Sequence, residues 1–166
     1  MPILPPLTYT LCFLTRADDV LLLHRRHPPN RGLWNGVGGR LEPGEAPLAG
    51  VLREVREETG YVLPFARFRG VLTWEGYEVP PGGLYLFTAE APASPGDPRP
   101  CDEGDLAWHP RAWVLTAPEV VSNLHRFGAA VLGTEKPAWH HCRYQAGQLT
   151  THEQRPLPSD LLARLG

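Results

Sequence analysis

The feature that most constrains this chain is a set of three closely spaced glutamates. Glu54, Glu57 and Glu58 stand at positions i, i+3 and i+4, so a helix through them projects all three carboxylates from one face. Pro47 suits the first turn of that helix, and Gly60 suits the left-handed position after its last turn. The adjacent arc carries the side chains that a helix packs against a core, namely Leu48, Val51, Leu52, Val55 and Thr59.

Carboxylates crowded on one helix face repel one another unless a cation lies among them. Ligand sets made only of oxygen suit hard divalent ions, so we expect Mg²⁺, with Mn²⁺ as a substitute, shared with substrate phosphates. The alternative is a solvated acidic face with Arg53 and Arg56 as local partners. Gly50 costs about 1 kcal/mol relative to alanine inside a helix, which indicates that another group approaches the helix closely there.

Length and composition place limits on the rest of the chain. The 166 residues fit a single domain over residues 1–166, large enough to fold without a disulfide or a metal. The net charge of −2 argues against general binding to a nucleic-acid polymer or an anionic membrane. Cys12, Cys101 and Cys142 are widely spaced and are predicted to be reduced thiols. With no secretory leader and no long apolar run, we expect a soluble cytoplasmic protein.

The spacing around the glutamates matches a known signature. Gly39, Glu45 and the run Arg53-Glu54-Val55-Arg56-Glu57-Glu58-Thr59-Gly60 resemble the Nudix box, the signature of the Nudix hydrolase superfamily. The box spans residues 39–61, and its one departure is Tyr61, where the family has an aliphatic residue. The resemblance implies the α/β Nudix fold, a mixed β-sheet sandwiched between helices, with the box as a loop–helix–loop motif.

The same resemblance implies roles for the box residues. Glu54, Glu57 and Glu58 would hold the metal and act in catalysis, and Arg53 would brace them by pairing with Glu45 or a neighbouring carboxylate. The implied reaction is hydrolysis of a nucleoside diphosphate linked to another group, with release of a nucleoside monophosphate and pyrophosphate from a triphosphate.

The segment that precedes the box, LWNGVGG, has three glycines in four residues. Glycines have no side chains to cover the backbone, so a carbonyl can reach a metal or a phosphate can reach an N–H. Together with residues 9–45 it resembles the MutT-like branch that hydrolyses oxidised purine nucleoside triphosphates such as 8-oxo-dGTP. That resemblance places Thr10 and Asn35 in the nucleobase pocket and makes the Gly38 carbonyl a metal ligand. Trp34 is interpreted as a core aromatic residue.

A basic cluster flanks this segment and has two interpretations. It is either a solvated loop or a positive rim that holds phosphates, since the planar guanidinium fork suits phosphate oxygens. Arg25 is the member that we assign to substrate binding. The cluster comprises Arg25, Arg26, Arg31 and Arg40.

The remaining elements follow from hydrophobic alternation and turn residues. Strands are predicted over residues 8–14, 20–24, 62–74, 84–90, 139–144 and 148–152, with a surface loop over 91–100. A capping box at residues 116–119 predicts a helix over 120–132. His140 and His141 are expected on opposite faces of their strand, which argues against a shared metal.

The resemblance extends to residues beyond the box. Glu103 matches a glutamate that completes the metal shell or positions the attacking water, and the general base is Glu58 or Glu103. Relatives that act on oxidised purines carry an acidic pair that reads the base, whereas this chain has Glu119, Ser122 and Asn123 in that region. We assign Asn123 to substrate binding.

We therefore expect a small nucleotide as the substrate and a monomer or homodimer as the assembly. An ADP-ribose or dinucleotide pyrophosphatase, or a Nudix domain used only for ligand sensing, are the alternatives. The complete set of box carboxylates favours an enzyme.

Overall fold

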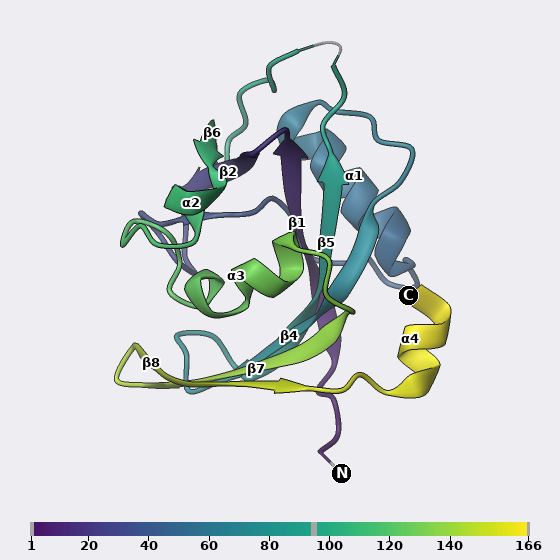
Figure 1. The fold of residues 1–166 in the computed structure, drawn as a ribbon, viewed down its shortest axis with the longest axis vertical. Helices are drawn as coiled ribbons and strands as arrows, with labels where there is room; N and C mark the ends of the chain where they lie inside the picture. Colours follow the sequence, from purple (N-terminus) through teal and green to yellow (C-terminus); the bar gives the residue numbers. More distant parts are fainter. Residues whose placement is uncertain (1, 94–95, 166) are drawn as a thin grey trace.

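The computed structural model describes residues 2–93 and 96–165, in which one large β-sheet lies between helices (Figure 1). The strands are β1 (Leu7–Arg16), β2 (Asp19–Arg25), β3 (Trp34–Asn35), β4 (Arg67–Glu75), β5 (Gly82–Glu90), β6 (Gly104–Pro110), β7 (Ala138–Gln145) and β8 (Gln148–Arg155). The helices are α1 (Pro47–Thr59), α2 (Arg111–Val114), α3 (Leu124–Leu132) and α4 (Ser159–Leu165).

The sheet is mixed. Its strands follow the order β3-β2-β1-β5-β4-β7-β8, and β6 pairs with β2. The pairs β1–β5 and β4–β7 are parallel, and the other pairs are antiparallel. The two parallel pairs bring β1, β5, β4 and β7 together in the middle of the sheet, although they are far apart in the sequence.

Side chains alternate along β1 between two hydrophobic layers. Leu11 and Phe13 belong to the layer that includes Val114 of α2 and the apolar face of α3. Cys12 and Leu14 belong to the opposite layer, with residues of α1 and α4. Figure 1 shows α3 in front of the sheet and α1 behind it. The predicted sheet between helices is confirmed.

Helix α1 has the predicted limits and the predicted buried face. Pro47 is its first residue, and Gly60 ends it with a φ of 82° and an N–H that donates to Arg56 O at 2.9 Å. Val51 and Val55 are fully buried. The close approach expected at Gly50 is found, because a Cβ there would lie 2.3 Å from Leu41 Cδ2 and 2.9 Å from a carboxylate oxygen of Glu45.

Two predicted elements begin at the wrong residue. The helix predicted over residues 120–132 begins at Leu124, because the segment before it pairs with β3 instead. Trp34 N–H donates to Glu119 O at 2.9 Å, and Val121 N–H donates to Trp34 O at 3.0 Å. The strand predicted over residues 62–74 begins at residue 67, after Pro64, which has no N–H for a strand ladder.

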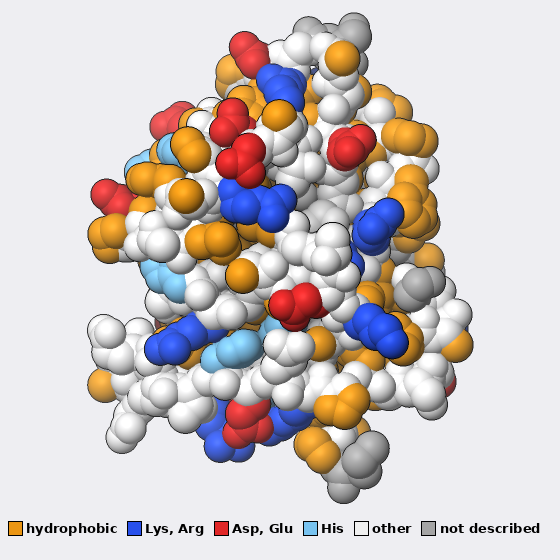
Figure 2. Space-filling view, viewed as in Figure 1, with side chains coloured by type: hydrophobic (Ala, Val, Ile, Leu, Met, Phe, Trp, Pro, Cys, Tyr) orange, Lys and Arg blue, Asp and Glu red, His pale blue; other side chains and the backbone are white. Residues whose placement is uncertain are grey.

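The other strand predictions are confirmed. The β7–β8 hairpin places His140 beside His152, and the β4–β7 pairing places His141 beside Thr73, so the two histidines face opposite layers. Within the described residues, none of the helices has both the length and the apolar character needed to cross a lipid bilayer. On the face drawn in Figure 2, acidic and basic side chains are interspersed.

Candidate active site

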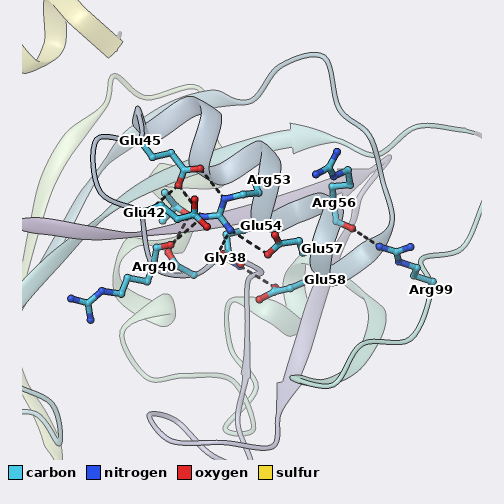
Figure 3. A network of polar contacts seen from close by, with 12 residues as sticks. Gly38, Arg40, Glu42, Glu45, Arg53, Glu54, Arg56, Glu57, Glu58 and Arg99 are labelled. Carbon is cyan, nitrogen blue, oxygen red and sulfur yellow. Dashed lines mark hydrogen bonds and ion pairs between the residues drawn. The ribbon is translucent and has the colours of Figure 1, made fainter.

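Arg53 of α1 is the centre of a carboxylate network (Figure 3). Its Nε and Nη2 donate to the two carboxylate oxygens of Glu45 at 2.8 Å each, and its Nη1 donates to Glu54 at 2.9 Å and to Glu57 at 3.2 Å. Hydrogen bonds from Arg53 lower the pKa of Glu45 to about 2. One guanidinium therefore orients three carboxylates from the loop and the helix, and the predicted pairing of Arg53 with Glu45 is confirmed.

Glu58 lies apart from this network and is only 7% exposed. Its Oε2 accepts a hydrogen bond of 3.1 Å from the N–H of Gly38. Burial raises the pKa of Glu58 to about 8, and the negative charges of Glu54 and Glu103 add to the rise. Burial also raises the pKa of Glu54, despite its bond to Arg53. These carboxylates are held close together, and their mutual repulsion favours a bound cation.

The glycine-rich segment before α1 runs antiparallel beside β1. Cys12 N–H donates to Val37 O at 2.6 Å, and Thr10 N–H donates to Gly39 O at 2.9 Å. A Cβ at Gly38 would lie 2.1 Å from Thr10 O, and one at Gly39 would lie within 2.6 Å of the Glu54 carboxylate oxygens. In the described part of the chain, the Gly38 carbonyl accepts no hydrogen bond. The segment thus needs glycine to fit between β1 and the helix carboxylates.

A cavity of about 380 Å³ opens beside these carboxylates. It contains Glu54, Glu58 and Glu103 together with the backbone of Gly38 and Gly39. The remaining lining is largely aromatic and aliphatic, with three asparagines and two arginines. A single space therefore brings together a polar wall of carboxylates and a wall suited to a flat apolar ring.

The NUDIX domain family model matches residues 5–129 of the chain. The chain belongs to the Nudix family. It is 36% identical over 104 residues to the uncharacterized Nudix hydrolase YvcI of Bacillus subtilis, covering 60% of this chain and 63% of that protein. It is 31% identical over 121 residues to the human 8-oxo-dGDP phosphatase NUDT18, covering 68% of this chain and 35% of that protein. The chain thus spans less than two thirds of either curated relative.

The fold has a solved counterpart. The crystal structure of the MutT protein from Bacillus halodurans aligns with a TM-score of 0.74 and 29% identity, over 90% of this chain and 98% of that one. The family match ends at residue 129, so β7 and β8 lie outside it. The Nudix box of this domain is the segment that forms the Arg53 network and the glycine-rich wall of the cavity.

Most of the predicted site residues of this Nudix domain line the cavity. They are Thr10, Arg25, Asn35, Gly38, Glu54, Glu58, Glu103 and Asn123. Arg53 and Glu57 do not line it. Arg53 lies behind the carboxylates that it orients, and the Glu57 side chain is 53% exposed beside it. The roles in metal binding and catalysis stay predictions for all ten residues.

The two interpretations of the basic cluster each fit some of its members. Arg25 and Arg40 line the cavity, whereas Arg26 pairs with Asp105 at 2.7 Å and Arg31 is exposed and is not part of the lining. Trp34, interpreted from the sequence as a core aromatic residue, is partly buried and packs against one hydrophobic layer. Its ring stacks on His24 at 4.7 Å between centroids and meets His109 edge-on at 4.5 Å.

The sequence analysis missed the aromatic wall of the cavity, formed by Tyr9, Trp74, Tyr77 and Tyr144. Tyr77 and Tyr144 pack with ring centroids 4.5 Å apart, although 67 positions separate them. Tyr144 comes from β7, so the hairpin beyond the family match contributes to the cavity.

Three asparagines line the cavity, and two of them, Asn35 and Asn123, are the sequence-predicted ones. Asn35 Oδ1 accepts from Gly36 N–H at 2.8 Å, which leaves the Asn35 amide N–H groups for other partners. Asn123 Oδ1 is buried and has no hydrogen-bond partner among the described residues. Of the residues in place of the expected acidic pair, only Asn123 lines the cavity, while Ser122 faces a separate hollow beside Arg126.

The donor chemistry of the site fits a divalent cation. The candidate ligands Glu54, Glu57, Glu58 and Glu103 and the Gly38 carbonyl are all oxygen donors. Within the described residues, no three acidic, histidine or cysteine side chains converge on one point as a ready-made metal cage. Such an incomplete protein set suits Mg²⁺, which keeps part of its shell for water and substrate phosphates.

Proposed function

We propose that this Nudix domain hydrolyses an oxidised purine nucleoside triphosphate, such as 8-oxo-dGTP, to the monophosphate and pyrophosphate. The observation that carries the proposal is the cavity itself. It joins buried carboxylates suited to a metal and a polyphosphate with an aromatic wall that bears asparagine amides. The names of relatives, including the human 8-oxo-dGDP phosphatase, support an oxidised purine nucleotide as the substrate.

The amides suit a base that has a carbonyl beside an N–H. The free N–H groups of Asn35 can donate to a carbonyl oxygen of the base. When its side chain turns toward the cavity that it lines, the unpartnered Asn123 Oδ1 can accept from a ring or exocyclic N–H. Guanine and its 8-oxo derivative present such an edge, and the aromatic wall can stack on the ring.

The metal-binding groups and the general base have separate tasks in this reaction. A divalent ion held by the box glutamates would, when bound, neutralise phosphate oxygens and stabilise the leaving pyrophosphate. Arg53 keeps Glu54 and Glu57 in place for this task. Water forms the new P–O bond as the bridging P–O bond breaks, and its proton passes to Glu58 or Glu103.

An ADP-ribose or dinucleotide pyrophosphatase is the second candidate. It is favoured by one observation, the neutral Asn123 in the cavity where the oxidised-purine branch is expected to carry acids. The decisive experiment compares kcat/KM for 8-oxo-dGTP, dGTP, ATP, ADP-ribose and a diadenosine polyphosphate in the presence of Mg²⁺. We expect 8-oxo-dGTP to rank first. A clear preference for ADP-ribose would replace the proposal, and no turnover of any compound would indicate a ligand-sensing module.

A further inference from the structure

Two loops meet at the mouth of the cavity through Asn30 and Tyr77. Asn30 lies in the loop between β2 and β3 and has a left-handed backbone with a φ of 63°. Its side-chain Oδ1 accepts a hydrogen bond from the hydroxyl of Tyr77, in the loop between β4 and β5. Its N–H donates to Glu78 Oε1 at 2.7 Å. The side chain and the backbone of Asn30 are therefore both held by the second loop.

The fixed loop in turn holds Arg25, the last residue of β2. Arg25 Nε donates to Pro29 O at 2.7 Å, and Pro29 directly precedes Asn30. Arg25, Pro29, Asn30 and Tyr77 all line the cavity. A continuous path of contacts thus runs from the Tyr77 hydroxyl through the loop to the guanidinium of Arg25.

Arg25 lines the same cavity as Glu58 of the carboxylate wall and Tyr77 of the aromatic wall. Burial raises the pKa of Glu58 to about 8 and that of Tyr77 to about 12, and the charge of Arg25 opposes both rises. Within the described residues Arg25 forms no ion pair. Its Nε is used by Pro29, so its terminal N–H groups are available to the cavity. This is where a polyphosphate chain would leave the base and approach the metal ligands.

We propose that the hydrogen bond between Tyr77 and Asn30 positions Arg25 to bind the polyphosphate of the substrate. Tyr77 is in this view a positioning residue that acts through the loop. The inference rests on the proposed function only in taking the ligand to be a polyphosphate, and it holds for any base.

The Tyr77 ring has a separate role, because it packs on Tyr144. Tyr77→Phe keeps that ring and removes only the hydroxyl. Asn30→Gly removes the side-chain acceptor and keeps a residue that tolerates a positive φ. Tyr85→Phe is the matched control, since it removes the hydroxyl of a half-buried tyrosine on β5 that does not line the cavity.

The experiment is a double-mutant cycle with Arg25→Gln, measured as kcat/KM for the best nucleotide of the substrate panel. We expect Tyr77→Phe and Asn30→Gly each to lower kcat/KM about 10-fold, mainly through KM, and Tyr85→Phe to leave it unchanged. In the Arg25→Gln background, Tyr77→Phe should lower kcat/KM by less than about 2-fold. An equal loss in both backgrounds, or no loss in either, overturns the inference.

A binding measurement separates this inference from the proposed function. Calorimetric titration with inorganic tripolyphosphate and Mg²⁺ needs no turnover and no base. Tyr77→Phe and Arg25→Gln should weaken this binding by similar factors of about 10, and the double variant should bind no more weakly than Arg25→Gln alone. If the chain hydrolyses no nucleotide but these shifts appear, the proposed function fails and the inference stands. Unchanged tripolyphosphate affinity in Tyr77→Phe refutes it, whatever the activity.

Discussion

Arg53 and Glu45 are joined by two parallel hydrogen bonds of 2.8 Å, and this pair links the loop before α1 to the second turn of the helix. The paired geometry leaves Nη1 of Arg53 directed at Glu54 and Glu57. The helix carboxylates are thus oriented by an arginine whose own position is fixed from the loop. Electrostatic preorganisation of this kind costs no reorganisation during the reaction.

Arg53→Lys tests this arrangement. A lysine ammonium lacks the planar guanidinium of arginine and cannot hydrogen-bond to Glu45, Glu54 and Glu57 together. We therefore expect kcat to fall about 100-fold. Loss of charged hydrogen bonds should also lower the free energy of unfolding by about 1 to 3 kcal/mol. Steady-state kinetics and urea unfolding measure the two effects. Arg56→Lys, an exposed change on the same helix, is the control and should alter neither quantity.

Glu57→Gln distinguishes a metal ligand from a structural partner of Arg53. The Glu57 side chain is 53% exposed, so the substitution should leave the thermal midpoint within about 2 °C of the original. If Glu57 binds the metal, kcat should fall about 1000-fold and the Mg²⁺ concentration for half-maximal rate should rise. Glu42→Gln, in the nearby loop, serves as the control. A loss below 10-fold with an unchanged Mg²⁺ requirement would assign Glu57 to supporting Arg53 only.

The box and its helix were predictable because their signals are local. The limits of α1 and its buried face follow from periodicity and spacing within about 20 residues. The pairing of Arg53 with Glu45 was implied by the resemblance to the Nudix box. The helix predicted over residues 120–132 was wrong at its start because residues 119–121 pair with Trp34, more than 80 positions away. The periodicity of the sequence near Val120 does not indicate that this segment pairs with Trp34.

The aromatic wall was unpredictable for the same reason. Its position depends on the parallel pairing of β4 with β7, in which Trp74 lies opposite Cys142. That register sets which β7 side chains reach the cavity, and it is decided by packing across the whole sheet. Tyr144 could not be assigned to the site from its neighbours in the sequence.

Asn123→Leu tests the base pocket. Leucine has a similar size but offers no acceptor, so a base N–H that pairs with Asn123 Oδ1 would be buried without a partner. We expect kcat/KM for 8-oxo-dGTP to fall about 10- to 100-fold, while the affinity for inorganic tripolyphosphate stays unchanged. Ser122→Ala is the matched control, because Ser122 faces the separate hollow. Equal losses for nucleotide and tripolyphosphate would argue against a role in reading the base.

His140 should make stability depend on pH. It is 1% exposed, and burial, with a contribution from the charge of His152, lowers its pKa from 6.5 to about 4. Between these values the unfolded chain binds a proton that the folded chain does not, so stability falls as pH falls from about 6.5 toward 4 and is fully present above that range. The contribution at pH 4.5 relative to pH 7.5 is about 2 to 3 kcal/mol.

Urea unfolding of the original chain and of His140→Gln across pH 4.5 to 7.5 measures this contribution as the difference between the two slopes. The variant should be less stable at pH 7.5, because it loses the hydrogen bond between His140 and His152, but it should lose less stability on acidification. His27→Gln, in an exposed loop, should keep the original pH dependence. If His140→Gln and His27→Gln lose stability in parallel as the pH falls, the acid sensitivity arises from carboxylates elsewhere and not from the buried imidazole.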